Sequence, residues 1–414
     1  MTGASQPWQW NDAALWQSCS NDAYDRAQEW QKNSAALYEK LSDVAAVQPL
    51  VSFAGDAVAM HTMLQHGQQL QQLSTRLVVI GTGGASLGAQ AFCRLSERPR
   101  SVLFLENCDP ATLDMFFRFD KAATSWCIIS KSGETVETLA AALALVSHYD
   151  GDAALKERVR VITAVPTSSL GKLAAQQGWP VISHPADLGG RFSVFSVVGM
   201  LPTAFAGLNV ASIVATAQTT MKQLLAASDE KLLPHAAWLA ANAAEKPMHL
   251  LMAYADRLRP ATQWFKQLWA ESLGKEDKGS TPVTAIGAID QHSQLQLYLD
   301  GPRDKLVTLW LPQVVGAGVT LPDVKIDSLA YFAGHTMGDV MQATSEATAT
   351  TLAKSGVPLR VARGALTPES LASWFVRQML EVLLVSMMLE VDPYSQPAVE
   401  EGKILTRAAL AKRV

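Results

Sequence analysis

Short apolar runs alternate with longer amphipathic stretches along most of the chain. The first series lies between residues 77 and 184 and is rich in β-branched residues. Runs of this length and composition, bounded by glycine and polar residues, predict buried strands. We place these strands at residues 77–81, 101–107, 125–130, 160–165 and 179–184. Helical patterns follow several of them, so the series predicts parallel β-α-β units with helices on both faces of a sheet.

A second series follows an alanine-rich helical stretch over residues 205–245. We place its strands at residues 249–255, 283–289, 295–301, 306–312 and 357–364. Patterns with helical periodicity predict long helices at residues 261–274, 334–354 and 367–391. The sequence therefore predicts an α/β protein with two tandem, mainly parallel sheets flanked by helices.

The two series set the expected domain boundaries. We expect an N-terminal helical segment (1–47), a first α/β domain (48–204), a second α/β domain with linking helices (205–391) and a C-terminal arm (392–414). The N-terminal segment carries four tryptophans, Trp8, Trp10, Trp16 and Trp30, spaced as packing anchors. No low-complexity linker and no sequence repeat accompany the change from one series to the next.

Composition narrows the class of protein. The 414 residues are 49% hydrophobic, which is ample for more than one core. The formal net charge of -4 gives no bulk attraction for nucleic acid, so any anion site must be local. The four cysteines lack metal-ligand spacing, the N-terminus lacks the pattern of a signal peptide, and no apolar run reaches membrane-spanning length. We expect a cytoplasmic protein without nucleic-acid or membrane partners.

The most informative turn is CIISKSGETVET, residues 127–138, where an apolar run ends in a cluster of hydroxyl side chains. Parallel sheets bind ligands outside the carboxyl ends of their strands, and a helix that begins there offers unpaired N–H groups and partial positive charge. Ser130, Ser132 and Thr135 add hydroxyl donors. A helix cap is the ordinary alternative, but one cap needs fewer hydroxyls. We interpret the turn as an anion site.

A second turn of this kind, GTGGASLG, occupies residues 81–88. A dinucleotide-binding G-x-G-x-x-G pattern would need glycine at position 86, where the chain has Ser86. The turn also lacks the glycine-lysine ending of a P-loop. The missing pattern argues against a dehydrogenase. It favours a loop whose backbone approaches a small sugar phosphate.

Four further motifs complete a pattern: GGRFSVFS (189–196), WAESLGK (269–275), DQHSQLQLYLDGP (290–302) and QPAVEEGK (396–403). With the two glycine-containing turns they resemble, in order, the motifs of the phosphoglucose isomerase family. The resemblance runs from about residue 77 to residue 403. It implies two sugar-isomerase (SIS) domains with a C-terminal arm. It also implies interconversion of glucose 6-phosphate and fructose 6-phosphate, in glycolysis and gluconeogenesis, without cofactor or metal.

The resemblance also implies roles for single residues. Glu271 matches the glutamate that moves a proton between C1 and C2, and His292 matches the histidine that helps to open and close the sugar ring. Lys403 matches the lysine at the ring oxygen and hydroxyls, and Arg191 the arginine beside the developing enediolate. The other matched residues line the substrate site: Gly84, Ser86, Ser130, Lys131, Ser132, Thr135, Gly190, Gln267 and Gln396. In this family the histidine comes from the neighbouring subunit, so the resemblance implies a homodimer with shared active sites.

These residue types suit the implied chemistry. Proton removal beside a carbonyl needs a positioned base and a group that stabilises the oxyanion. A glutamate can serve as the base, an arginine is a fixed cation, and a histidine can both donate and accept protons near neutral pH. Taken without the resemblance, Glu271 would be a solvated helix carboxylate, Arg191 a surface arginine and Lys403 a solvated tail lysine. His335 is expected to be an ordinary polar histidine.

The chain departs from the family pattern at several positions. Ala85 stands where the family has a phosphate-binding serine, and Ser86 follows it. Leu273 stands where the family commonly has asparagine, and Ser395 stands where an acid, an amide or a histidine is more usual. Two alternatives therefore stay open: a related isomerase that also or instead uses mannose 6-phosphate, and a non-catalytic sugar-phosphate sensor. A sensor would keep the turn at 130–138 but would have no use for Glu271, His292 and Lys403 together.

Overall fold

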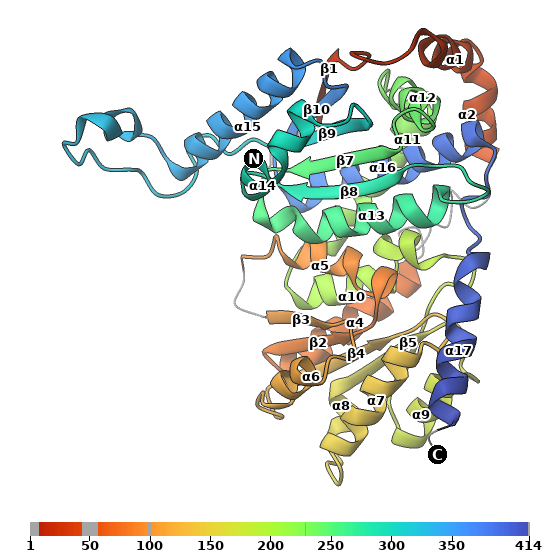
Figure 1. Ribbon diagram of the computed structural model, residues 1–414. Helices are drawn as coiled ribbons and strands as arrows, with labels where there is room; N and C mark the ends of the chain where they lie inside the picture. Colours follow the sequence, from red (N-terminus) through yellow and green to blue (C-terminus); the bar gives the residue numbers. More distant parts are fainter. Residues whose placement is uncertain (1–7, 44–56, 98–100, 228, 413–414) are drawn as a thin grey trace. The chain divides into compact units, whose positions relative to one another are not determined.

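The computed structural model describes residues 8–43, 57–97, 101–227 and 229–412 (Figure 1). The chain forms two compact units, each built from two chain segments. Unit 1 comprises Met1–Leu41 and Thr220–Pro393, and unit 2 comprises Ser42–Thr219 and Tyr394–Val414. The predicted domains were continuous, whereas these units are interleaved along the sequence. The predicted boundary at residues 47 and 48 lies outside the described residues.

Unit 2 contains a five-stranded, wholly parallel sheet in the order β3-β2-β4-β5-β6. Its strands are β2 (Arg76–Ile80), β3 (Ser101–Leu105), β4 (Thr124–Ile129), β5 (Val159–Thr163) and β6 (Val181–Ser183). All five strands predicted for the first series are confirmed. The central strand β4 is buried along its whole length, as expected for a parallel sheet with helices on both faces.

Helices cover both faces of this sheet (Figure 1). The helices assigned mainly to unit 2 are α4 (Ala57–Leu73), α5 (Leu87–Cys93), α6 (Pro110–Phe117), α7 (Val136–His148), α8 (Leu155–Arg158), α9 (Ser169–Gln177), α10 (Val197–Phe205), α11 (Val210–Leu225) and α17 (Glu400–Ala411). On one face, α6, α7 and α9 enclose a core that includes Ile80, Trp126 and Leu145. On the other, α10 packs against α4, α5 and β2.

Unit 1 contains the second five-stranded sheet, in the order β1-β10-β9-β7-β8. Its strands are β1 (Gln9–Ala14), β7 (Met248–Ala253), β8 (Thr281–Ile286), β9 (Lys305–Pro312) and β10 (Leu359–Gly364). Strand β1 runs antiparallel to β10, and the other pairs are parallel. The predicted fold class, two mainly parallel α/β sheets flanked by helices, is therefore confirmed.

The edge strand β1 corrects the N-terminal prediction. The segment 1–47 was expected to be helical, and helices α1 (Asn21–Lys32) and α2 (Ser34–Asp43) do form there, but residues 9–14 are a strand. Its exposure alternates from residue to residue, the pattern of a half-buried strand. Trp8 packs edge-on against Trp310 and Trp374, so the tryptophans anchor this segment to unit 1.

A second correction concerns residues 295–301, which were predicted to be a strand. They belong to α14 (Ile289–Asp300), which ends at Gly301. The letters LQLYL alternate between apolar and polar, but so short a run cannot separate strand from helix by periodicity. The Asp290 carboxylate accepts the backbone N–H of Ile286 at 2.6 Å and side-chain donors from the following turn, which supports a helix start.

The remaining helices of unit 1 pack on both faces of its sheet (Figure 1). They are α12 (Leu232–Asn242), α13 (Arg259–Leu273), α15 (Met337–Lys354) and α16 (Pro368–Leu389). Among the described helices, α16 alone is long and apolar enough to cross a membrane, which corrects the expectation that no run reaches that length. Since 89% of its apolar window is buried inside the protein, α16 is a core helix of unit 1.

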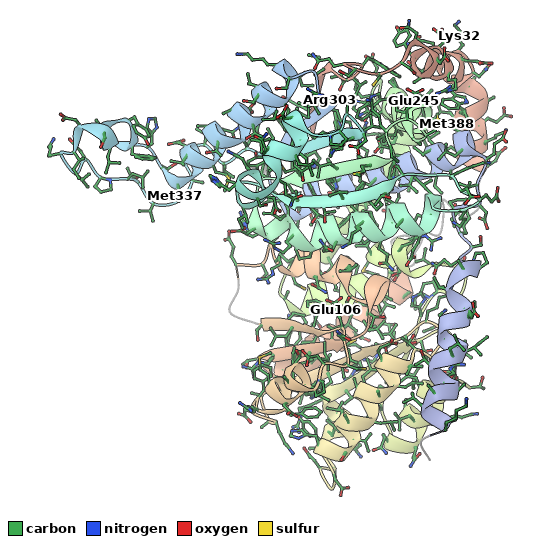
Figure 2. All side chains as sticks on the ribbon, in the orientation of Figure 1. Lys32, Glu106, Glu245, Arg303, Met337 and Met388 are labelled. Atoms are coloured by element: carbon green, nitrogen blue, oxygen red, sulfur yellow. The ribbon has the colours of Figure 1, made fainter. Side chains whose placement is uncertain are left out.

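Between β9 and α15 the chain leaves unit 1 as an extended arm, residues 313–336 (Figure 1). Its apolar side chains are unusually exposed: Val315 by 73%, Val319 by 74% and Tyr331 by 68%. Met337, where the chain returns into α15, is also exposed (Figure 2). An apolar surface of this kind typically marks a site of interaction.

Candidate active site

Strand order places a ligand-binding edge in unit 2. Strand β2 has β3 on one side and β4 on the other, so the chain connections diverge between β2 and β4. In open α/β sheets, ligands bind at this switch point, outside the carboxyl ends of the strands. The turns that follow β2 and β4 are residues 81–86 and 130–135, which contain six of the residues predicted to line the substrate site.

The turn after β2 lies against the short helix that carries Arg191. A Cβ atom on Gly84 would lie 2.2 Å from the carbonyl carbon of Gly190, so position 84 requires glycine for the two backbones to meet. The hydroxyl of Ser193 lies 3.2 Å from the carbonyl oxygen of Gly84 and 2.8 Å from that of Gly190. Unit 2 thus brings Gly84, Gly190 and Arg191 together.

Ser86 lies at the end of the same turn, but its side chain is already engaged. It is buried, and its hydroxyl contacts the Glu106 carboxylate and lies 3.2 Å from the carbonyl oxygen of Gly83. A phosphate at Ser86 would have to compete with a carboxylate. The neighbouring Ala85 has no hydroxyl, so this turn offers a ligand mainly backbone groups.

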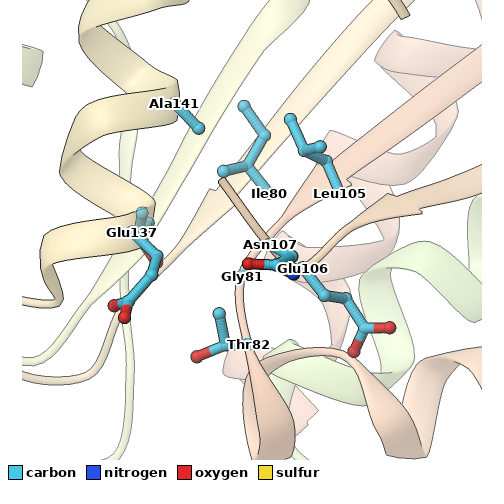
Figure 3. A pocket seen from close by; sticks show the side chains of 9 residues that line it. Ile80, Gly81, Thr82, Leu105, Glu106, Asn107, Glu137 and Ala141 are labelled. Atoms are coloured by element: carbon cyan, nitrogen blue, oxygen red, sulfur yellow. The ribbon is translucent and has the colours of Figure 1, made fainter. Parts of the chain in front are cut away.

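Beside this turn, Figure 3 shows the side chains around a small, shallow hollow at the ends of β2 and β3 and the first turns of α7. Its lining residues are Ile80, Gly81, Thr82, Leu105, Glu106, Asn107, Glu137, Thr138 and Ala141. The carboxylates of Glu106 and Glu137 lie on opposite sides of Thr82. Two carboxylates repel an anion, so the hollow is not a phosphate site.

The turn after β4 holds a set of linked hydroxyls. The oxygens of Ser130 and Thr135 lie 3.0 Å apart, and the Ser130 hydroxyl also accepts the backbone N–H of Gly133 at 3.1 Å. Gly133 has a φ of +66°, and a Cβ atom there would lie 1.9 Å from Oγ of Ser168. Thr135 precedes α7, but its side chain makes no capping hydrogen bond. A simple helix cap therefore does not account for these hydroxyls.

The charged residues of this turn point to different neighbours. Burial lowers the pKa of Lys131, and the nearby charge of Asp187 opposes that shift. Ser132 is exposed and accepts the backbone N–H of Glu134 at 3.2 Å. Glu134 turns away to α9, where its carboxylate accepts both the N–H and the hydroxyl of Ser169, at 2.8 and 2.9 Å. The acid therefore does not oppose an anion at the turn.

Arg191 is not the surface arginine that its sequence context allowed. Its side chain is only 1% exposed, and its guanidinium lies 5.4 Å from the centre of the Phe192 ring. Burying a charged group is unfavourable unless it is paired and hydrogen-bonded. The short helix Gly190–Phe195, which is buried from Arg191 onward, holds this cation in place.

Gln396 and Lys403 lie in the C-terminal segment that completes unit 2. Tyr394, just before Gln396, packs its ring 5.7 Å from that of Phe192, next to Arg191. Lys403 is on α17, where its ammonium contacts the Glu400 carboxylate at 2.6 Å and is exposed. Within the predicted C-terminal arm (392–414), α17 is a short helix whose residues are all exposed.

Gln267 and Glu271 lie one turn apart on α13 in unit 1. The Gln267 amide donates to Oε1 of Glu271 at 3.0 Å. Residues four apart on a helix share a face, which allows this contact. The amide oxygen of Gln267 is buried without a hydrogen-bond partner among the described residues. The helix ends just beyond, where the ammonium of Lys275 donates to the carbonyl oxygens of Glu271 and Ser272.

His292 is also in unit 1, but at the other edge of the sheet. Helix α13 connects parallel strands β7 and β8 and so runs antiparallel to them, which puts Glu271 beside the start of β8. His292 follows the end of β8, in the first turns of α14, and is exposed. A strand of six residues spans about 20 Å, so unit 1 does not bring Glu271 and His292 together.

The last points concern His335 and metal binding. His335, the expected ordinary histidine, is exposed at the end of the arm, 3.8 Å from the Asp339 carboxylate. Among the residues that the structure describes, no three His, Cys, Asp or Glu side chains come close enough to hold a metal ion.

Sequence reasoning missed several residues that shape these sites. The Ser193 hydroxyl links the turn at Gly84 to the one at Gly190. The Glu106 carboxylate accepts a hydrogen bond from Ser86, and the Glu134 carboxylate accepts one from the start of α9. Ser193 could have been found, since it lies two residues from Arg191 in the same motif. The partners of Glu106 and Glu134 depend on tertiary contacts 20 and 35 residues away.

Known proteins resemble this chain over most of its length. The phosphoglucose isomerase family matches residues 57–292. A glucose-6-phosphate isomerase from Rubrobacter xylanophilus is 34% identical over 82% of this chain and 83% of its own length. A probable glucose-6-phosphate isomerase from Haloarcula marismortui is 37% identical over 81% of this chain and 78% of its own length.

Solved structures share the fold. A hypothetical protein from Thermus thermophilus superposes with a TM-score of 0.88 at 27% identity, over 98% of this chain and 100% of its own. A glucose-6-phosphate isomerase from Chlamydia trachomatis superposes with a TM-score of 0.70 at 20% identity, over 97% of this chain and 77% of its own. The extent and identity of the sequence matches establish that this chain belongs to the phosphoglucose isomerase family.

Proposed function

We propose that the protein is a glucose-6-phosphate isomerase that interconverts D-glucose 6-phosphate and D-fructose 6-phosphate. One observation carries the proposal: the chain belongs to the phosphoglucose isomerase family. The hydroxyl-rich turn at the switch point of a parallel sheet agrees with it. We place the enzyme in the cytoplasm, in glycolysis and gluconeogenesis, and expect it to need neither cofactor nor metal.

The substrate phosphate binds at the turn after β4. Ser130, Ser132 and Thr135 supply hydroxyls, Lys131 supplies a cation, and the start of α7 supplies backbone N–H groups. Gly84 lets the backbone of Gly190 approach the turn after β2, and we place the sugar beside these two glycines. Binding energy from the phosphate, far from C1 and C2, helps to orient the open-chain sugar.

The proton transfer falls to Glu271. Its carboxylate removes the proton from C2 of the aldose, and the electrons of that C–H bond form the C1=C2 double bond of a cis-enediolate with its negative charge on O1. A proton then moves from O2 to O1, and Glu271 returns its proton to C1 as the C2 carbonyl of the ketose forms. The hydrogen bond from Gln267 fixes the orientation of this carboxylate. The negative charge that develops on the enediolate is balanced by Arg191, a buried cation that stays protonated.

Ring opening falls to His292 and Lys403, and we propose that His292 acts in the active site of a second subunit. The support is its position, because it lies at the opposite edge of the unit 1 sheet from Glu271 and is exposed to solvent. The exposed apolar residues of the arm support a homodimer as well. So does α17, where Ile404 is 66% and Leu405 60% exposed.

A coupled assay tests the reaction. Purified protein is given fructose 6-phosphate in the presence of EDTA, and glucose 6-phosphate and mannose 6-phosphate are measured separately. We expect glucose 6-phosphate to form readily. Formation of mannose 6-phosphate alone would replace the proposed substrate, and binding of sugar phosphate without turnover would identify a sensor.

Mixing two inactive variants tests the shared site. His292→Ala and Glu271→Gln proteins are denatured together and refolded, so that mixed dimers form. In a mixed dimer one site has both intact residues, so a random mixture should recover about a quarter of wild-type activity. Each variant refolded alone is the control, and no recovery in the mixture would place His292 in the site of its own chain.

A further inference from the structure

The C-terminal helix α17 contacts the proposed phosphate-binding turn, residues 130–135 (the phosphate turn), through one arginine. Nη2 of Arg407 donates to the backbone carbonyl oxygen of Glu134 at 2.9 Å, and it lies 4.0 Å from the Glu134 carboxylate. Both residues belong to unit 2. A hydrogen bond from a charged donor is stronger than one between neutral groups. Its acceptor is main chain, so this contact fixes α17 relative to the backbone of the turn itself.

The turn that receives Arg407 is itself firmly anchored. The Glu134 carboxylate accepts two hydrogen bonds from Ser169, at the start of α9, and the backbone N–H of Leu170 donates to the carbonyl oxygen of Gly133 at 3.0 Å. The two hydrogen bonds from Ser169, together with the charges of Arg407 and Lys172, outweigh the effect of burial and lower the pKa of Glu134. The acceptor of Arg407 is thus held by α9 and does not move freely.

Helix geometry connects this contact to the predicted catalytic lysine. Lys403 and Arg407 are four residues apart on α17 and so project from the same face, about 6 Å apart along the helix axis. Because Arg407 is bound to the phosphate turn, the face that carries Lys403 is turned toward that side. The ammonium of Lys403 donates a hydrogen bond to the Glu400 carboxylate, one turn earlier on the same helix.

We propose that Arg407 is a positioning residue: it ties α17 to the phosphate turn and thereby aligns Lys403 with a sugar whose phosphate occupies that turn. The inference rests on the proposed function, because it assigns the phosphate to residues 130–135 and ring chemistry to Lys403. Phosphate adds contacts to a turn that α9 already holds, and the tie passes this added order to α17. Arg407 itself contacts neither the phosphate nor the sugar.

Steady-state kinetics provide the first test. Arg407→Ala should lower kcat about tenfold while the KM for fructose 6-phosphate changes less than about twofold, because a displaced lysine harms the reaction more than phosphate binding. Arg407→Lys, which keeps the charge, should recover part of the loss. Lys412→Ala removes a cation near the end of the same helix and should leave both constants unchanged.

A double-mutant cycle asks whether Arg407 acts through Lys403. If it does, Arg407→Ala should lower kcat by less than about twofold in a Lys403→Ala background. Equal losses in both backgrounds would overturn the proposal, since Arg407 would then act independently of the lysine.

Hydrogen exchange gives a test that does not depend on turnover. Inorganic phosphate, added to the full-length protein, should slow amide exchange in α17 of the wild type and of Lys412→Ala, but not of Arg407→Ala. Phosphate that leaves α17 exchange unchanged in the wild type, or that slows it equally in Arg407→Ala, would overturn the tie. A wild-type protein without isomerase activity would reject the proposed function, and the exchange result would still decide the role of Arg407.

Discussion

In unit 2 the predicted phosphate residues follow the carboxyl ends of β2 and β4, whereas in unit 1 the predicted base lies beside the amino end of β8. Two sheets with similar strand order thus carry their candidate chemistry at opposite edges. Unit 2 obeys the general rule for parallel sheets, and its site could be found from that rule. The corresponding edge of unit 1, between β7 and β9, leads into the arm and not to Glu271.

The two units also differ in where their polar groups lie. In unit 2, hydroxyls gather in the turns at the strand ends. In unit 1, charges are buried in the core: Arg360 makes two hydrogen bonds to Glu381, at 2.6 and 2.9 Å, and neither side chain is exposed. Arg360 also donates to Thr308 on β9. We therefore expect substitutions in unit 1 to separate into effects on catalysis and effects on stability.

The largest expected effect is on catalysis in unit 1. Glu271→Gln removes the proposed base and nearly keeps its shape, so kcat should fall about 10³-fold. Inhibition by inorganic phosphate, which reports on unit 2, should stay within about twofold of wild type. Glu276→Gln, an exposed neighbour beyond the end of α13, is the matched control. Turnover retained in the Glu271 variant would remove its assignment as the base.

The next effect is on stability in the same unit. Glu381→Gln leaves Arg360 buried without a counter-ion and should lower the free energy of unfolding by about 3 to 5 kcal/mol. Glu346→Gln breaks a partly exposed pair with Arg363 and should lower it by less than about 1 kcal/mol. Urea denaturation measures both. Similar losses would show that burial of the Arg360 pair has no special weight.

A smaller effect on stability should appear as the pH is lowered. Nδ1 of His235 accepts a hydrogen bond from Arg377, so its Nε2–H must donate to Asp12, and the neutral ring satisfies both contacts. Burial lowers the pKa of His235 from 6.5 to about 4. The unfolded chain therefore binds more protons than the folded protein between these values, and stability present above pH 6.5 is lost as the pH falls toward 4.

Urea titrations from about pH 7.5 to 4.5 measure this loss, which should be on the order of 2 kcal/mol for His235. In His235→Gln the loss should be smaller over the same range. Asp12 does not confuse the result, because its pKa is also lowered and its protonation lies below the range studied. A wild-type stability that stays constant down to about pH 4.5 would contradict the assignment of a buried neutral ring.

The smallest expected effect lies in the phosphate turn of unit 2. Gly133 and Gly178 have nearly the same left-handed backbone, with φ of +66° and +65°, so alanine is strained at both by about 1 kcal/mol. Only at Gly133 would the new Cβ collide, with Ser168. Gly133→Ala should raise the inhibition constant of phosphate about tenfold, and Gly178→Ala less than about twofold. Equal changes would show that the turn tolerates distortion.

The phosphate turn and Glu271 show how far the sequence could lead. Hydroxyls after a strand predict an anion site from local chemistry alone, and the structure brings Ser130 and Thr135 within hydrogen-bond distance. Glu271 looks like any carboxylate on a helix, and only the family resemblance singled it out. Strand β1 was missed because its partner, β10, is far along the chain, and α14 because its short apolar run fits both secondary structures.

The pairing of β1 with β10 also bears on how the chain is made. On the ribosome, Gln9 emerges about 350 residues before its partner strand, which at typical synthesis speeds is a delay of roughly 20 to 70 s. The strands of unit 2 have all been synthesised by Ser183, so that sheet can form early. At that stage, the strands and helices that later cover Trp8 and Trp10 have not been synthesised. The nascent chain thus carries an uncovered aromatic strand through most of its own synthesis, an obvious ligand for a chaperone.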